Sequence, residues 1–401
     1  MKFGIIREGK TPPDKRVPLS PQQCESFKHS YPNAELVVQP SAIRAFSDDS
    51  YTQSGITLQE DLSDCDVLLG VKEVPFDMLI PEKTYLFFSH TYKLQPYNSE
   101  LLRTILDKKI RLIDYEVLTN AKGKRLIGFG RYAGVVGCYN GFLAYGKKTG
   151  RYELKQANLC ADRVELNAEL KKIDLPADFK MVITGDGRVA GGALEIIEAA
   201  GLKRVSPDAY KNAQFDEPVY AQLLVSDYNE RLDGSSFKRK DFYADPTPFR
   251  SSFMQFAKGT HMYVPCHYWN SKSPYIFTRE DAKSPDFDIK VVADVSCDID
   301  CAVASTLRPS TISDPLYGYD ATLEKEVDFM DENAIGVMAV DNLPCELPLD
   351  ASEDFGNELL THILPNFFNG DPEGVLARAS ETTLEGELTT SFAYLEDYAK
   401  G

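Results

Sequence analysis

The sequence predicts an α/β fold made of two doubly wound domains with a cleft between them. Short apolar runs alternate with segments of helical spacing over residues 2–115, and a second alternation of the same kind begins near residue 180. The second series opens on a glycine-containing turn between a strand and a helix. Strands that alternate with helices form parallel sheets with helices on their faces, so each series is expected to form one such domain.

The first series contains five expected strands, at 2–6, 35–39, 66–71, 85–89 and 110–115. Segments with helical spacing lie between them, at 21–31 and 96–108. Helix-prone segments at 138–148 and 161–172 separate the two series. The second series is expected to have a helix at 189–200 and strands at 180–184, 203–206, 262–265, 290–295 and 336–340. The segment 351–368 is amphipathic until Pro365 interrupts it.

Composition excludes several classes of protein. Net charge is −17 and no run of Lys and Arg stands out, so no nucleic-acid surface is expected. No stretch approaches the 18 apolar residues of a membrane span, and four uncharged residues before Arg7 are too few for a signal peptide. The eight cysteines suggest no disulfide framework. A cytoplasmic protein is expected.

The turn in "KMVITGDGRVAGGALEIIEAAG" fits a dinucleotide-binding βα unit. Gly185 and Gly187 occupy the first two positions of the G-x-G-x-x-G/A fingerprint, and Ala190 takes the third. The helix that begins at Arg188 and Val189 would offer its N-terminal N–H groups to a pyrophosphate. A plain strand–turn–helix connection is the alternative. Both domains are thus expected to be Rossmann-like.

The position that reads the ribose does not decide between NAD and NADP. An acidic residue about 20 positions after the glycines would mark NAD, but Ser206 stands near that point. Lys203 and Arg204 precede it and Asp208 follows it. A serine with nearby cations suits a 2′-phosphate, although both cations can equally be solvated surface residues.

Chemistry-bearing side chains gather at the expected strand ends of the first domain. Ligands of open α/β sheets bind outside the carboxyl ends of the strands, so these side chains are placed to share one cleft. Taken singly, each is more often a surface or structural residue. The group consists of Lys72 and Glu73 in "GVKEVP", His90 and Lys93 in "FFSHTYK", Glu116 in "IDYEVL", and Arg16 just before a helix that Ser20 would cap.

A metal site is not expected. "SCDIDC" brings Cys297, Asp298, Asp300 and Cys301 together, and Cys266 precedes His267. Structural zinc needs a second matching pair of ligands, and none is evident.

In this order the motifs resemble a known family. "RVPLSP", "GVKEVP", "FFSHTYKLQ", "GKRLIGFGRYAG", "GDGRVAGGALEI", "VADVSCDI" and "AVDNLP" are similar to alanine dehydrogenase, the transhydrogenase α subunit and the L-lysine-forming saccharopine dehydrogenases. The likeness is closest to the lysine–ketoglutarate reductase half of the bifunctional aminoadipate-semialdehyde synthases. It covers nearly the whole chain and weakens at 138–180 and 205–240.

The resemblance implies roles for individual residues. Lys72 and His90 match the acid–base pair of the family, and Arg16 matches an arginine that contacts a substrate carboxylate. Glu73 and Glu116 match acidic residues that tune the pair and meet the amino group. The remaining matches are Lys93 and Arg131 for a second carboxylate, and Asp294, Asp341 and Asn342 for loops at the nicotinamide end.

The resemblance also implies domains and a reaction. Residues 1–137 plus 345–401 are expected to form the substrate domain, and 138–344 the dinucleotide-binding domain. The expected activity is the NAD- or NADP-dependent interconversion of saccharopine with L-lysine and 2-oxoglutarate, by a monomer or small homo-oligomer. The alternatives are an alanine dehydrogenase-type enzyme and a regulatory protein that binds NAD(P) without turnover.

Overall fold

The computed structural model of the protein describes residues 1–299 and 301–400 and divides into two compact units. Unit 1 consists of Met1–Phe129 and Pro348–Gly401, and unit 2 consists of Gly130–Leu347. The expected boundaries, 137/138 and 344/345, differ from these because one unbroken helix, α4 (Gly130–Thr149), begins unit 2. The sequence motif "GRYAGVVG" contains three glycines, which obscured the start of that helix.

Unit 1 is built on a six-stranded parallel sheet in the order β3-β2-β1-β4-β5-β6. This is the doubly wound order, in which the direction of strand addition across the sheet reverses between β1 and β4. The strands are β1 (Lys2–Ile5), β2 (Glu35–Val38), β3 (Thr57–Leu58), β4 (Val67–Leu69), β5 (Thr84–Phe87) and β6 (Arg111–Asp114). All five strands expected in the first series are present.

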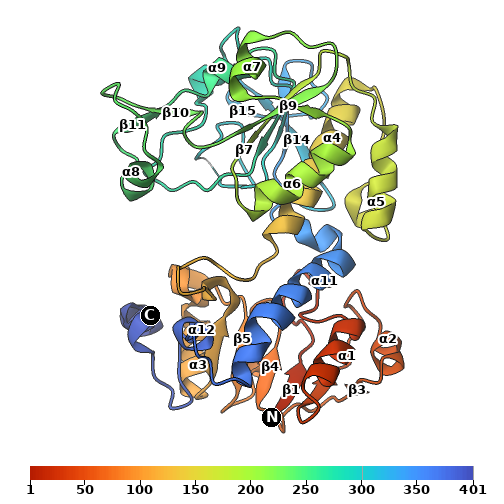
Figure 1. Ribbon diagram of the computed structural model, residues 1–401, viewed down its shortest axis with the longest axis vertical. Helices are drawn as coiled ribbons and strands as arrows, with labels where there is room; N and C mark the ends of the chain where they lie inside the picture. The colour runs from red at the N-terminus through yellow and green to blue at the C-terminus, as the bar shows by residue number, and fades with distance from the viewer. Residues whose placement is uncertain (300, 401) are drawn as a thin grey trace. The chain divides into compact units, whose positions relative to one another are not determined.

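Helices cover both faces of this sheet (Figure 1). On one face, Phe27 of α1 and Phe355 of α11 pack on the side chains of alternate strand residues such as Phe3 and Ile5. On the other face, Leu101 of α3 packs against the opposite set. The helices are α1 (Pro21–Ser30), α2 (Asp48–Gln53), α3 (Ser99–Asp107), α11 (Pro348–Glu358), α12 (Val375–Ala379) and α13 (Glu396–Lys400).

Local signals explain where two of these helices begin and end. Ser20 caps α1 as expected, because its hydroxyl accepts from the N–H of Gln23 while the Gln23 side chain accepts from the N–H of Ser20. The amphipathic segment expected at 351–368 is helical up to a π-helical turn, η8 (Leu359–Ile363), and Pro365 lies in the 3-10 turn that follows.

Unit 2 has an eight-stranded sheet in the order β15-β14-β16-β13-β12-β7-β9-β8. Its strands run in one direction except for β14, which pairs antiparallel with both β16 and the edge strand β15. They are β7 (Lys180–Thr184), β8 (Lys203–Arg204), β9 (Val219–Leu223), β12 (Met262–Pro265), β13 (Val291–Ala293), β14 (Leu316–Asp320), β15 (Lys325–Val327) and β16 (Ala334–Met338). A separate hairpin pairs β10 (Asn229–Arg231) with β11 (Phe249–Ser251).

Two layers of helices enclose this second sheet (Figure 1). The long helix α4 packs on β12, β13, β16 and α6, and aromatic residues such as Phe253 and Phe256 fill the opposite face. The helices are α5 (Arg163–Glu169), α6 (Arg188–Ala199), α7 (Pro207–Asn212), α8 (Arg239–Ala244), α9 (Met254–Ala257) and α10 (Arg279–Ala282). The α/β class and the two doubly wound domains are confirmed, with a parallel sheet in unit 1 and a mixed sheet in unit 2.

One strand differs from expectation in a way that matters for the site. The strand expected at 203–206 is only two residues long and lies at the sheet edge, and β9 takes the place beside β7. Both residues of β8 are exposed, so it carries none of the apolar side chains that would hold it in the centre. No helix among the described residues is long and apolar enough to cross a membrane.

Candidate functional site

The reversal of strand order between β1 and β4 places Glu8 beside the backbone of Lys72. Glu8 follows β1, and its carboxylate accepts from the backbone N–H groups of Val71 (2.7 Å) and Lys72 (2.8 Å). These bonds tie the loop after β4 to the loop after β1. Burial raises the pKa of Glu8 to about 7. Lys72 is half-buried, and within the described part of the chain its ammonium group makes no hydrogen bond or ion pair, which leaves it available to a ligand.

His90 and Glu73 are joined directly. Nδ1 of His90 lies 2.7 Å from Oε1 of Glu73, whose other oxygen accepts from Nζ of Lys10 at 2.6 Å. Although burial opposes it, the hydrogen bonds from His90 and Lys10 lower the pKa of Glu73 to about 2. Glu73 is thus an anion over the physiological range, and Nδ1 of His90 carries the proton of this hydrogen bond.

Glu116 approaches the same imidazole from β6. Its Oε2 lies 3.9 Å from Nε2 of His90, and its Oε1 accepts from Nζ of Lys93 at 2.6 Å. A guanidinium nitrogen of Arg125 lies 3.6 Å from Oε1. Burial opposes ionisation, but Lys93 and Arg125 outweigh it and lower the pKa of Glu116. The His90 ring therefore stands between two carboxylates, each of which is bound to an exposed cation.

Arg16 is buried, with 3% of its surface exposed, and its guanidinium forms a two-pronged ion pair with Asp14. Nε and one terminal nitrogen donate to the two Asp14 oxygens at 3.0 and 2.6 Å, and the planar group lies 4.2 Å from the Phe129 ring centre. Burial of Asp14 raises its pKa, but Arg16 and the charge of Lys72 outweigh it and the pKa falls to about 2. The Asp14–Arg16 pair thus lies near the Lys72 side chain.

The glycine turn of unit 2 has the geometry that the fingerprint requires. Gly185 has a φ of +105°, and a Cβ there would lie 2.4 Å from the carbonyl oxygen of Cys266. A Cβ at Gly187 would meet nothing within 4 Å. Gly187 is the N-cap of α6 and has no side chain to bond the first N–H groups of that helix. Open space in front of a helix N-terminus fits a nucleotide pyrophosphate.

Close helix packing holds this turn in place. A Cβ at Gly134 would lie 1.8 Å from the Val189 carbonyl oxygen, and one at Gly192 would lie 1.8 Å from that of Arg131. Glycine is therefore required at both contacts between α4 and α6. Ala190 is fully buried between these elements. Arg131 lies on α4 and donates to both oxygens of Glu195, and its expected contact with a substrate carboxylate stays a prediction.

The other nucleotide-site candidates lie in different settings. Ser206 is exposed and caps α7 by accepting from the N–H of Ala209, while β9 supplies the contact to the glycine turn through Gln222, which donates to the Gly185 carbonyl at 2.8 Å. Asp294 is fully buried, and its carboxylate accepts from Ser296, Cys297 and Thr306. Asp341 and Asn342 follow β16; Asp341 is exposed and Asn342 begins a 3-10 turn, η7 (Leu343–Glu346). Arg188 and Val189 open α6.

Several members of these groups were missed from the sequence. Glu8 stands at the end of β1, where the strand-end rule that selected Lys72 and His90 would also have found it. Lys10 and Asp14 lie in a loop after β1, and Arg125 lies in the motif "GKRLIGFGRYAG" but had no expected role. In unit 2, Arg239 forms a two-pronged ion pair with Asp186, the residue between the two glycines. The two residues are 53 positions apart in the sequence, so no local spacing pattern predicts their contact.

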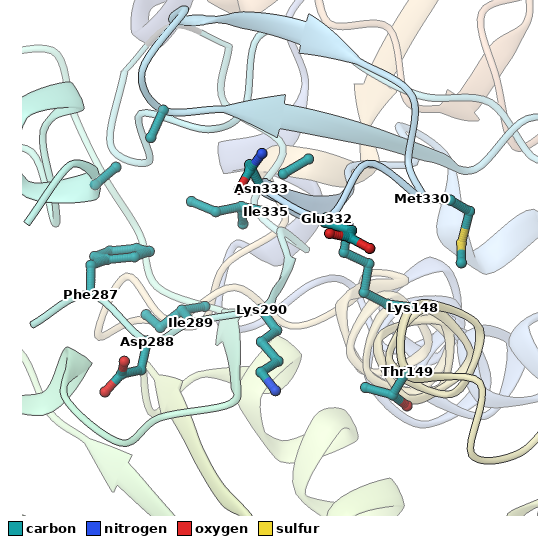
Figure 2. A pocket seen from close by; sticks show the side chains of 13 residues that line it. Lys148, Thr149, Phe287, Asp288, Ile289, Lys290, Met330, Glu332, Asn333 and Ile335 are labelled. Carbon is teal, nitrogen blue, oxygen red and sulfur yellow. The ribbon is translucent and has the colours of Figure 1, made fainter. Parts of the chain in front are cut away.

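Neither a metal centre nor the most evident cavity adds to these sites. Within residues 1–299 and 301–400, no group of His, Cys, Asp and Glu could hold a metal ion; Asp300 of the "SCDIDC" motif lies outside the described residues. A cavity of about 610 Å³ in unit 2 is lined by Lys148, Lys290 and Glu332 (Figure 2). It lies at the N-terminal ends of β13 and β16, at the opposite ends of the strands from the glycine turn.

Comparison with known proteins identifies the first part of the chain. Residues 4–136 match the family described as alanine dehydrogenase/PNT, N-terminal domain. The family resemblance expected from the motifs is confirmed. Among solved structures, an L-alanine dehydrogenase has the same fold, with a TM-score of 0.67, 15% identity and 99% of both chains covered. A transhydrogenase from Sinorhizobium meliloti gives a TM-score of 0.61, 13% identity and coverage of 97% and 100%.

Curated relatives extend the similarity over the whole chain. An alpha-aminoadipic semialdehyde synthase of Arabidopsis thaliana is 30% identical over 98% of this chain and 41% of its own length. The mitochondrial protein of that name from Mus musculus is 29% identical, over 98% of this chain and 47% of its own length. This chain therefore spans less than half of these relatives. A saccharopine dehydrogenase [NAD(+), L-lysine-forming] of Emericella nidulans is 24% identical over 90% of both chains.

Proposed function

We propose that this protein is an NAD(P)-dependent oxidoreductase that interconverts saccharopine with L-lysine and 2-oxoglutarate. One observation carries the proposal: Lys72 follows β4 at the point where the strand order reverses, and its ammonium group is unengaged among the described residues. The next residue, Glu73, binds the imidazole of His90, which Glu116 approaches from its other nitrogen. The names of the relatives supply the substrate and the cofactor.

The two units have separate tasks in this proposal. Unit 1 holds the amino-acid substrate, and unit 2 holds the nucleotide at Gly185, Gly187 and the first turn of α6. The bound nicotinamide supplies hydride transfer to or from the substrate carbon.

Residues of unit 1 transfer the protons of the proposed reaction. When hydride leaves the glutamyl Cα of saccharopine, the secondary amine loses its proton and an imine forms. Water then adds to the imine, and the carbinolamine breaks its C–N bond to give L-lysine and 2-oxoglutarate. In this proposal Lys72 and His90 transfer the protons at the substrate nitrogen and at the oxygen of the attacking water, as general acid and base. Glu73 fixes the orientation of His90 by holding its Nδ1 proton.

Cations around the site suit a substrate with three carboxylates. Lys10, Lys93 and Arg125 are each more than one-third exposed at the side chain. Each is bound to Glu73 or Glu116, and a substrate carboxylate can join such a pair. Arg16 is turned toward Asp14, so its contribution is to hold that loop and the charge beside Lys72.

A spectrophotometric screen tests the function. NADH and NADPH are each incubated with the protein and either 2-oxoglutarate plus L-lysine or pyruvate plus ammonia. We expect nucleotide oxidation only with the first pair, with saccharopine as the product identified by mass spectrometry. Oxidation with pyruvate and ammonia instead would assign alanine dehydrogenase activity. A thermal shift with nucleotide, without oxidation by either pair, would assign a regulatory nucleotide-binding protein.

A further inference from the structure

Two carboxylates with no exposed surface lie under the loop that carries His90. Asp114 ends β6, and Glu381 comes from a distant segment that pairs with the same strand. That segment forms an antiparallel bridge between Ser380 and Ile113, and the N–H of Glu381 donates to the carbonyl of Leu112 at 2.8 Å.

Two hydroxyl groups link these carboxylates in a continuous chain. Oγ of Ser89 lies 2.5 Å from Oδ2 of Asp114 and 2.5 Å from Oγ1 of Thr91. Oγ1 of Thr91 lies 2.5 Å from Oε2 of Glu381. Ser89 and Thr91 are the two neighbours of His90, whose backbone has a left-handed φ of +57°. The series of hydrogen bonds therefore holds the residues on both sides of His90.

This series of hydrogen bonds lacks one proton if both acids are ionised. Four oxygens in a row make three hydrogen bonds, and each bond needs one proton. The hydroxyl groups of Ser89 and Thr91 supply two protons, and two carboxylates supply none. The third proton must therefore belong to one of the acids.

Their surroundings indicate which acid is neutral. Burial raises the pKa of Asp114, but Asp114 also accepts from the N–H groups of Ser89 (2.9 Å) and Glu116 (2.6 Å), which favour its charged form. Oε1 of Glu381 is buried without a hydrogen-bond partner in the described part of the chain. Burial, together with the charge of Asp114, raises the pKa of Glu381 to about 8.

We propose that Glu381 is a carboxylic acid at neutral pH and donates its proton into an ordered chain, Glu381 to Thr91 to Ser89 to Asp114, which positions His90. The protonation state stands on the geometry alone; the positioning of the acid–base histidine rests on the proposed function. Glu381 and Asp114 do not touch substrate in this scheme and act through the backbone of the His90 loop.

The groups that face this pair allow a simple pH dependence. Tyr394 in the 3-10 segment η10 (Thr390–Leu395) and Tyr398 in α13 both feel the charge of Glu381, which adds to burial in raising the pKa of each hydroxyl. Glu116 adds its negative charge on the side of Asp114. No cation forms an ion pair with either acid among the residues that the structure describes. Rising pH thus removes the Glu381 proton with no positive charge to replace it.

Infrared spectroscopy of the full chain tests the proton. At pH 6, the spectrum of the unsubstituted protein minus that of Glu381→Gln should contain the carbonyl band of a protonated carboxylic acid. Glu381→Asp, which keeps an acid, should move that band. Glu385→Gln, at an exposed position nearby, should leave it unchanged. A difference spectrum with carboxylate bands alone, or a band that neither Glu381 variant alters, would overturn the proposal.

The positioning role is tested at Thr91, which is fully buried. Thr91→Val keeps the shape but removes the hydroxyl link, whereas Thr91→Ser keeps the link. We expect Thr91→Val to lose at least about tenfold in kcat with KM changed less than about threefold, and Thr91→Ser to stay within about threefold of the unsubstituted protein. Equal losses in both variants would overturn the positioning role. Failure of the proposed function is distinct, since it would abolish turnover even without substitution and leave the infrared band in place.

Discussion

Glu73 holds His90 by a 2.7 Å contact between Oε1 and Nδ1, while its second oxygen binds Lys10. The carboxylate is 9% exposed, so these partners stabilise it more than solvent does. We expect Glu73→Gln to lower the free energy of unfolding by about 2 kcal/mol at pH 6, as is usual for a hydrogen bond to a charged group. Chemical denaturation measures this, with Glu25→Gln on the exposed side of α1 as the control.

The pH dependence of that loss follows from the direction of the pKa shift. The pKa of Glu73 is lowered from 4.5 to about 2, so its stabilisation is present above pH 4.5 and is lost as the pH falls toward 2. The difference in stability between the unsubstituted protein and Glu73→Gln should shrink over that window. A difference independent of pH would contradict the assignment of an ionised Glu73.

The Asp14–Arg16 pair separates a structural role from a substrate-binding one. Arg16→Ala removes the guanidinium that binds the buried Asp14 carboxylate through two hydrogen bonds and should cost about 3 kcal/mol of stability. The double substitution Asp14→Ala/Arg16→Ala should cost less than Arg16→Ala alone, because no unpaired charge remains. Denaturation of the single and double variants measures this. A double variant less stable than Arg16→Ala would contradict the pairing.

The two glycines of the turn should respond differently to one added methyl group. Gly187→Ala meets open space, so stability should stay within about 0.5 kcal/mol, while nucleotide affinity should fall at least about tenfold because the methyl group enters the pyrophosphate position. Gly185→Ala forces a left-handed backbone and a close contact with Cys266 and should unfold more readily. Calorimetric titration with NADH and NADPH, together with thermal melting, checks both. Unchanged affinity in Gly187→Ala would contradict the nucleotide site.

We expect the ion pair between Arg239 and Asp186 to affect how tightly the glycine turn binds a negatively charged ligand. Arg239→Ala exposes the Asp186 carboxylate beside the pyrophosphate position, so nucleotide affinity should fall by about tenfold. Asp186→Asn in the same chain should restore most of it, because the repulsive charge is gone. Titration of the two single variants and the double variant measures the coupling. Additive effects would contradict it.

Much of the fold was predictable because its signals are local. Apolar runs of four to six residues located the parallel strands, and "SPQQ" announced the cap of α1 through Ser20. The start of α4 was missed because its glycines serve close packing against α6, a tertiary requirement that resembles a loop in the sequence. The position of β9 beside β7 was missed because strand order depends on long-range pairing.

The candidate site was predictable only in part for the same reason. Four of the site residues follow strands: Lys72, Glu73, His90 and Glu116. Because the strands are parallel, the loops that follow them lie at the same end of the sheet. Glu381 lies 290 residues beyond Thr91 in the chain, so no spacing rule connects them. Arg131 was selected by a motif, and its ion pair with Glu195 on α6 had no signal in the sequence.

The most direct test of the account compares Lys72→Met with Lys122→Met, which lies on an exposed loop. Turnover of 2-oxoglutarate and L-lysine is measured with saturating nucleotide, and a parallel titration confirms nucleotide binding. We predict that Lys72→Met loses at least about 10²-fold in kcat, as expected for an acid–base group, while Lys122→Met keeps the full rate. A Lys72→Met variant within about threefold of the unsubstituted rate would contradict the account.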